Sequence, residues 1–73
     1  MTADTELVCP IVVNGDPLAT RAGTLAELLA ELGLTAQRVA TARNGDFVPE
    51  RQRSETRLDA GDRIEIVSPR HGG

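Results

Sequence analysis

The sequence predicts an α+β domain in which a sheet of four to five strands packs on one main helix. One segment, residues 25–32, repeats leucine with the period of a helix. Two Asn-Gly dipeptides, typical of tight hairpins, each separate two strand-like segments. A helix with a single apolar face needs one sheet to cover it, which gives two layers. The chain of 73 residues is long enough for one domain only.

The first hairpin is expected near the N-terminus, after a disordered lead-in over residues 1–6. Proline cannot donate to a ladder, so the first strand should begin at or just after Pro10. The β-branched run 11–13 suggests a strand covered on both faces. Asn14-Gly15 suits a type I′ turn, in which both central residues have positive φ. The return strand, roughly 17–21, is polar, as an edge strand can be.

The helix has clear start and stop signals. Thr24 and Glu27 form the pattern of a capping box, in which each side chain bonds a free main-chain N–H. Gly33 provides a left-handed stop. Glu27 and Glu31 lie off the apolar stripe and are expected in solvent. The stripe itself consists of Leu25, Leu28, Leu29 and Leu32.

A second hairpin follows the helix. Residues 39–43 read as a strand, Asn44-Gly45 as its turn, and Phe47-Val48 as a short strand that Pro49 ends. Phe47 is expected in the core; if it were exposed, it could instead be an apolar anchor for a partner.

The last third of the domain alternates loop and strand. Residues 50–57 read as a polar loop with solvated charges, and 59–62 as a turn. Residues 63–67 alternate and form the last strand, so the domain spans 1–67. Residues 68–73 have no periodicity and are expected to be a flexible tail. The predicted core is Ile11, Val13, Leu25, Leu28, Leu29, Leu32, Val39, Leu58, Ile64 and Ile66.

Composition excludes several classes of function. The net charge is −3 and Phe47 is the only aromatic residue, which argues against binding nucleic acid by phosphate contacts or base stacking. No apolar run approaches the roughly 18 residues of a membrane span, and the acidic N-terminus is unlike a signal peptide. We expect a soluble cytoplasmic protein that is monomeric when free.

The residues do not predict an enzyme. A zinc site needs three or four ligands, but Cys9 and His71 lie at opposite ends of the chain. No Ser-His-Asp set can assemble around a histidine in the tail, and Cys9 is expected to be a packed, unreactive thiol. The glycines match no phosphate-binding motif. We therefore expect no catalytic residue, bound cofactor or metal ion.

The sequence ends in Gly72-Gly73, a pair with its own chemistry. A carboxylate is a poor electrophile and must be activated, for instance by ATP as an acyl adenylate. Residues without Cβ atoms can enter a narrow enzyme channel in conformations that other residues avoid. In this interpretation the chain supplies the acyl group and a partner supplies the catalysis. Arg70 and His71 are candidates for contacts with that partner.

Several collinear blocks resemble the ThiS family, the small ubiquitin-like sulfur carriers of thiamine thiazole biosynthesis. The resemblance covers about residues 11–73, and its most specific block runs from Val39 to Pro49. The extra residues before Pro10 depart from the family pattern, and the Arg70-His71 pair is closer to ubiquitin-type tails. The other matching blocks are 11–16, 23–29, 59–67 and 72–73.

The resemblance implies a ubiquitin-like β-grasp fold, with a mixed sheet in which the first and last strands lie side by side and parallel. It implies that an E1-like adenylyltransferase (ThiF type), using ATP and magnesium, adenylates Gly73. A sulfurtransferase or cysteine desulfurase then provides sulfur, which gives a thiocarboxylate. Thiazole synthase (ThiG type) takes this sulfur for the thiazole ring. The activating enzyme is expected to grip the exposed sheet face and the tail.

Other functions fit the same features. The chain could carry sulfur for molybdopterin, cysteine or a thiolated natural product. It could be a ubiquitin-like protein modifier, although the absence of lysine forbids chains linked through its own lysines. It could also be a plain β-grasp interaction domain in which Gly72-Gly73 is inert.

Overall fold

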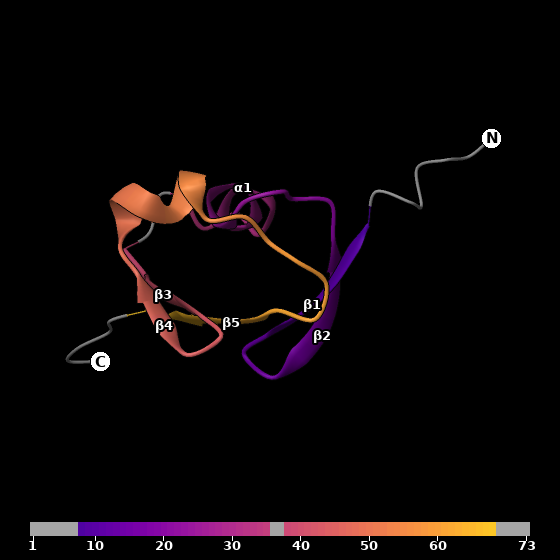
Figure 1. Ribbon diagram of the computed structural model, residues 1–73. Helices are drawn as coiled ribbons and strands as arrows, with labels where there is room; N and C mark the ends of the chain where they lie inside the picture. The colour runs from indigo at the N-terminus through magenta and orange to yellow at the C-terminus, as the bar shows by residue number, and fades with distance from the viewer. Residues whose placement is uncertain (1–7, 36–37, 69–73) are drawn as a thin grey trace.

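The computed structural model describes residues 8–35 and 38–68 of the chain. The predicted lead-in and tail residues 69–73 lie outside these ranges. Figure 1 shows one main helix and a shorter 3₁₀ helix above a five-stranded sheet. The elements are β1 (Cys9–Val13), β2 (Asp16–Thr20), α1 (Leu25–Glu31), β3 (Ala40–Arg43), β4 (Asp46–Val48), the 3₁₀ helix η2 (Glu50–Glu55) and β5 (Arg63–Val67).

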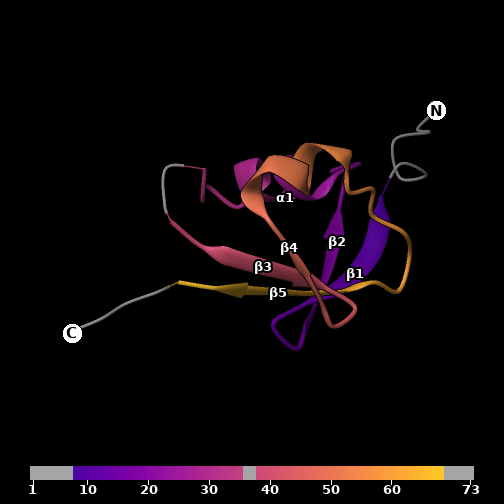
Figure 2. The same ribbon diagram turned by 60° about the vertical axis from the view of Figure 1, so that its left-hand side comes forward.

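The sheet is mixed, with the strand order β2-β1-β5-β3-β4. The first and last strands, β1 and β5, are parallel neighbours, and the other pairs are antiparallel. In both views α1 and η2 lie over the same face of the sheet (Figures 1 and 2). This confirms the predicted two-layer α+β fold and the parallel pair that the resemblance implied.

Strand β1 starts at Cys9, one residue earlier than predicted, because Pro10 does not interrupt its ladder with β2. The N–H of Val12 donates to the Asp62 carbonyl (2.9 Å), so alternate residues of β1 direct their main chain toward β5. The nitrogen of Pro10 thus points away from β2, and its carbonyl accepts from Gly61 (2.8 Å). Because both helices lie over one face, the expectation that 11–13 would be covered on both faces is wrong.

Both predicted hairpin turns are confirmed. Asn14 and Gly15 have φ values of 52° and 88°, and Asn44 and Gly45 have 53° and 88°. These are the positive angles that a type I′ turn requires at both central residues. The two hairpins, β1–β2 and β3–β4, flank β5 on either side.

The helix begins as predicted but ends before its last leucine. Thr24 Oγ1 accepts from the Glu27 N–H (3.2 Å), and Glu27 Oε1 accepts from the N–H of Gly23 (2.7 Å). Gly33 has a φ of 76° and stops the helix. Leu32 is the C-cap residue and is 37% exposed, so its assignment to the core is wrong.

The core lies between the helix and the sheet and largely matches the prediction. Val13 and Ile66 are partly buried and pack against it. Val39 is half-buried and lies outside the cluster, so its prediction as a core residue is wrong. Val48 was missed. The buried apolar residues are Ile11, Leu25, Leu28, Leu29, Val48, Leu58 and Ile64.

Phe47 lies outside the core, against expectation, with 69% of its surface exposed. Successive side chains of a strand point to opposite faces. Val48 pairs with the buried Thr41 and faces the helix, so Phe47 must face away from it. The pattern of a strand only three residues long could not tell which of the two was buried.

The segment predicted as the polar loop 50–57 contains the 3₁₀ helix η2, which Pro49 precedes. Its charged side chains are mostly exposed, as predicted. Hydrogen bonds join the following residues to the start of α1: Leu25 donates to Thr56 (2.8 Å), and Leu58 donates to Gly23 (3.0 Å). These bonds place Leu58 in the core, which confirms that prediction.

Candidate functional site

The site residues predicted from the sequence all follow β5 in the chain. Arg70, His71, Gly72 and Gly73 lie outside the described residues, so their roles stay predictions. The last described residue is Ser68, directly after β5. The structure therefore defines β5, which this segment follows in the chain, and the surfaces beside β5.

The C-terminal half of β5 is held on both edges, by β3 and by one side chain. On one edge Val67 pairs with Ala40 and Ile66 with Thr41. On the other edge the Asn14 carboxamide makes two bonds to Ile66: Oδ1 accepts from its N–H (2.9 Å) and Nδ2 donates to its carbonyl (3.1 Å). A turn residue thus acts in place of a neighbouring strand at the end of β5.

The N-terminal end of β5 is held by a second hairpin asparagine and a buried carboxylate. Asn44 Oδ1 accepts from the Arg63 N–H (2.8 Å), and Asn44 Nδ2 donates to Asp62 Oδ1 (3.0 Å). Asp62 Oδ2 accepts from Arg43 Nε (2.7 Å) and from the Asp59 N–H (2.8 Å). This group joins the start of β5 to the β3–β4 hairpin and the preceding turn.

The pKa values in this group follow from its contacts. Burial alone would raise the pKa of the Asp62 carboxyl. Hydrogen bonds from Asp59, Asn44 and Arg43 outweigh it, so the pKa lies below its ordinary value. The same hydrogen bond between Arg43 and Asp62 raises the pKa of the Arg43 guanidinium. The carboxylate is ionised and fully bonded, which suits a structural anchor rather than a proton donor.

Four apolar residues lie on the sheet face opposite the helices, beside the exposed Glu65, which pairs with Ala42. Thr41 is buried on the helix side, so its neighbours Ala40 and Ala42 belong to the opposite face. Ala42 pairs with Phe47, and Ala40 pairs with the exposed Val67. We call these four residues the outer patch. Two small residues thus separate a large exposed aromatic from a valine at the end of β5.

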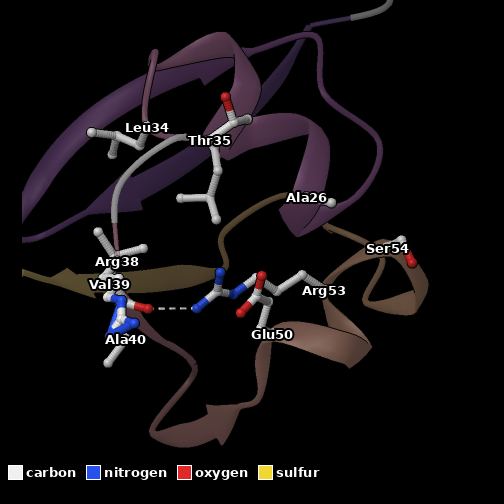
Figure 3. A pocket seen from close by; sticks show the side chains of 10 residues that line it. Ala26, Leu34, Thr35, Arg38, Val39, Ala40, Glu50, Arg53 and Ser54 are labelled. Carbon is white, nitrogen blue, oxygen red and sulfur yellow. Dashed lines mark hydrogen bonds between the residues drawn. The ribbon is translucent and has the colours of Figure 1, made fainter.

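A groove on the helix side does not form a comparable site. It lies between α1 with the segment that follows it, the start of β3, and η2, and Figure 3 shows the side chains around it. The Arg53 guanidinium beside it donates to the Val39 carbonyl (2.6 Å) and to Thr41 Oγ1 (3.1 Å). One of the two arginines that line the groove is therefore engaged in bonding the start of β3 to η2.

The part of the chain that the structure describes contains no cluster of metal ligands, and its one cysteine packs against the core. Over residues 8–35 and 38–68, no three His, Cys, Asp or Glu side chains gather as metal ligands. Cys9 is half-buried and packs against the core, as expected of a structural thiol. Among the same residues no helix is long and apolar enough to cross a membrane.

Sequence reasoning missed the two asparagines as strand anchors. Asn14 and Asn44 were interpreted only as residues that tolerate positive φ, and Asp62 only as part of a turn. Asn14 lies 52 positions from its partner Ile66. Asn44 lies 19 positions from Arg63 and 18 from Asp62. No pattern within a short window could have indicated such pairs.

Comparisons with known proteins agree with this architecture. The profile of the ThiS family matches residues 10–73. The crystal structure of the thiamine biosynthesis protein (ThiS) from Geobacter metallireducens superposes with a TM-score of 0.73 at 28% identity. That alignment covers 88% of this chain and 99% of the other.

A curated relative is a thiazole synthase from Paramagnetospirillum magneticum, 36% identical over 64 residues. The match covers 86% of this chain, which spans about a fifth (20%) of the length of that relative. The family match includes every described strand except the first residue of β1, and the sheet has the order and directions of a β-grasp. This chain belongs to the ThiS family and has its ubiquitin-like β-grasp fold.

Proposed function

We propose that this protein is a sulfur carrier of thiamine biosynthesis. In this proposal the Gly73 carboxylate is adenylated, converted to a thiocarboxylate and used as the sulfur donor for the thiazole ring. The observation that carries the proposal is the family match, which extends over residues 10–73 and so includes Gly72 and Gly73. A carrier of this kind is a substrate of other enzymes and needs no catalytic group of its own.

The chemistry consists of one activating step followed by the transfer of sulfur. A carboxylate oxygen of Gly73 attacks the α-phosphate of ATP and displaces pyrophosphate, which leaves an acyl adenylate. The terminal sulfur of a persulfide on a sulfurtransferase or cysteine desulfurase then attacks the acyl carbon and displaces AMP, which gives an acyl disulfide. A second thiol attacks the sulfur that belongs to that enzyme, forms a disulfide with it and releases the thiocarboxylate. The net change replaces one carboxylate oxygen by sulfur. ATP and magnesium belong to the activating enzyme (ThiF type), and this chain supplies the acyl group.

The outer patch is the surface that we assign to the activating enzyme. Exposed aromatic residues are typical anchors of protein interfaces, and Phe47 is the only aromatic residue of the chain. Val67 lies in the same patch at the end of β5, so a partner bound there would stand close to the start of the C-terminal segment. We assign Arg70 and His71 to contacts with the same enzyme.

A thiazole synthase (ThiG type) is the partner that we propose for sulfur delivery. In the Paramagnetospirillum protein named thiazole synthase, a segment similar to this chain accounts for only a fifth of the length. A carrier-like segment and a much longer remainder therefore share one polypeptide in that relative. Covalent linkage raises the effective concentration of two modules, which suits a carrier and its acceptor.

Intact mass spectrometry of the protein purified from its own host tests the proposal. We expect a species in which one oxygen is replaced by sulfur, confined to the C-terminal peptide. A variant lacking Gly73, purified in the same way, is the matched control and should lack this species. Detection of the free acid alone, after incubation with ATP, magnesium, a sulfur source and the host's activating enzyme, would refute the carrier proposal. Adducts on lysines of other proteins would instead identify a protein modifier.

A further inference from the structure

The end of β5 has an open edge, and among residues 8–35 and 38–68 the side chain that bonds this edge is that of Asn14. Strand β1 pairs with β5 as far as Val13 and Ile64, and then turns away into its hairpin. Beyond that pair, β5 continues for three more residues to Val67. An unpaired edge leaves main-chain N–H and C=O groups without partners.

Ile66 is the residue whose main-chain polar groups lie on this open edge. The Asn14 N–H donates to the Ile64 carbonyl (2.9 Å), so Ile64 and Ile66 both direct their main chain toward β1. Because β1 has turned away before this point, the N–H and the carbonyl of Ile66 have no partner on a neighbouring strand at this edge. The Asn14 side chain bonds both of them, at 2.9 and 3.1 Å, as a strand residue would.

We infer that Asn14 is a positioning residue for the C-terminal segment: its carboxamide holds Ile66 so that the segment carrying Gly73 leaves the sheet from a fixed point. The inference rests on the proposed function. An enzyme that activates Gly73 must bind the residues between Ile66 and Gly73 in one conformation. If the start of this segment is fixed before binding, the segment loses less conformational entropy when the enzyme binds it. Removing the bonds from Asn14 should therefore weaken capture of the segment more than the chemical step.

The chain contains its own matched control. Asn44 occupies the same turn position as Asn14, with a φ of 53° against 52°. Its carboxamide also makes two hydrogen bonds, but these lie at the opposite end of β5, on Arg63 and Asp62. Replacing Asn44 removes a comparable number of bonds without touching Ile66.

The first experiment measures amide hydrogen exchange in Asn14→Gly and Asn44→Gly, both of which keep the positive φ of the turn. Loss of one such hydrogen bond should lower the protection of the Ile66 amide roughly tenfold in Asn14→Gly. The same amide should keep its protection in Asn44→Gly, relative to the global stability of each variant. If Ile66 stays protected in Asn14→Gly, the inference is wrong.

The second experiment measures pyrophosphate release by the host's activating enzyme as a function of carrier concentration. For Asn14→Gly we expect KM to rise about fivefold and kcat to change less than about twofold, because the reacting carboxylate is distant in sequence from Ile66. Asn14→Asp keeps the acceptor for the Ile66 N–H and loses the donor, so its KM should fall in between. Asn44→Gly should keep the wild-type KM even where it is the less stable variant.

The outcomes separate the two proposals. If the wild-type chain is activated but KM is the same for all variants, or rises equally in Asn44→Gly, Asn14 has no positioning role. If the wild-type chain is never activated or thiolated, the proposed function is wrong, and the role of Asn14 in that reaction falls with it. The exchange measurement needs no enzyme and distinguishes these two failures.

Discussion

Asp62 is the side chain on which the start of β5 depends most, and Asp62→Ala tests this directly. Its carboxylate is 7% exposed and accepts three hydrogen bonds, from Arg43, Asn44 and the Asp59 N–H. Replacement by alanine removes the acceptor for all three and leaves the Arg43 charge without its closest partner. The matched control is Asp59→Ala, which removes only a pair between Arg43 and a 76% exposed carboxylate (3.1 Å).

The size of the effect follows from these contacts. A hydrogen bond to a charged group contributes about 1.5–3 kcal/mol, so three would sum to roughly 4.5–9 kcal/mol. Arg43 is 31% exposed, so in the variant it gains contacts with water and keeps its pair with Asp59, which reduces the loss. We therefore expect Asp62→Ala to lower the free energy of unfolding by about 3–5 kcal/mol, in the range for breaking a buried pair. For Asp59→Ala we expect less than about 1 kcal/mol.

The contribution of Asp62 also depends on pH, with a definite sign. Its pKa is lower in the folded chain than in the unfolded one, so the unfolded state binds more protons as the solution is acidified. The stabilisation is complete above the unfolded pKa of about 3.9 and disappears as the pH falls through the folded value. The difference in stability between wild type and Asp62→Ala should therefore be constant near neutrality and shrink below about pH 4.

Urea unfolding followed by far-UV circular dichroism suits this chain, because it contains no Trp or Tyr. A domain of this size is expected to have a stability of roughly 4–11 kcal/mol, so Asp62→Ala should be close to the limit of folding. Thermal unfolding should show a fall in Tm of roughly 15 °C or more. A loss equal to that of Asp59→Ala, or a difference from wild type that does not decrease in acid, would show that the bonds to Asp62 are not what stabilises this end of β5.

Three further changes test the packing, the outer patch and a turn. Leu28→Ala, at a fully buried helix position, should lower the unfolding free energy by about 2–5 kcal/mol in urea, and a loss below about 1 kcal/mol would contradict its place in the core. Phe47→Ser should leave stability nearly unchanged but raise KM for activation by the host's enzyme, and an unchanged KM would remove Phe47 from the proposed interface. Gly45→Ala places a Cβ at a φ of 88° and should lower Tm by an amount equivalent to about 1–2 kcal/mol, whereas an unchanged Tm would refute the positive φ.

Local features of the sequence predicted the elements well. The two Asn-Gly turns, the Thr24 cap and the Gly33 stop depend on residues within a few positions of one another. The last strand was predicted with its observed bounds, because its alternation is strict over residues 63–67. The resemblance to the ThiS family supplied the parallel pairing of the first and last strands, which no local pattern contains.

The errors occurred where a pattern was too short or reached the end of an element. The strand around Phe47 has three residues, so its alternation left open whether Phe47 or Val48 was buried. Leu32 continued the helical period but lies just past the last residue of α1. The η2 helix is polar on all sides and offered no periodic signal.

By itself the sequence determined the order of the strands and the main helix, most of the core and the candidate chemistry of Gly72 and Gly73. Only the tertiary structure decided how β5 is held, because Asn14 and Ile66 are 52 positions apart and meet only when β1 and β5 pair. It also decided that Phe47 and Val67 share a face, since that depends on strand register across β3. Local patterns depend on neighbours in the chain, whereas anchors and surfaces depend on neighbours in space.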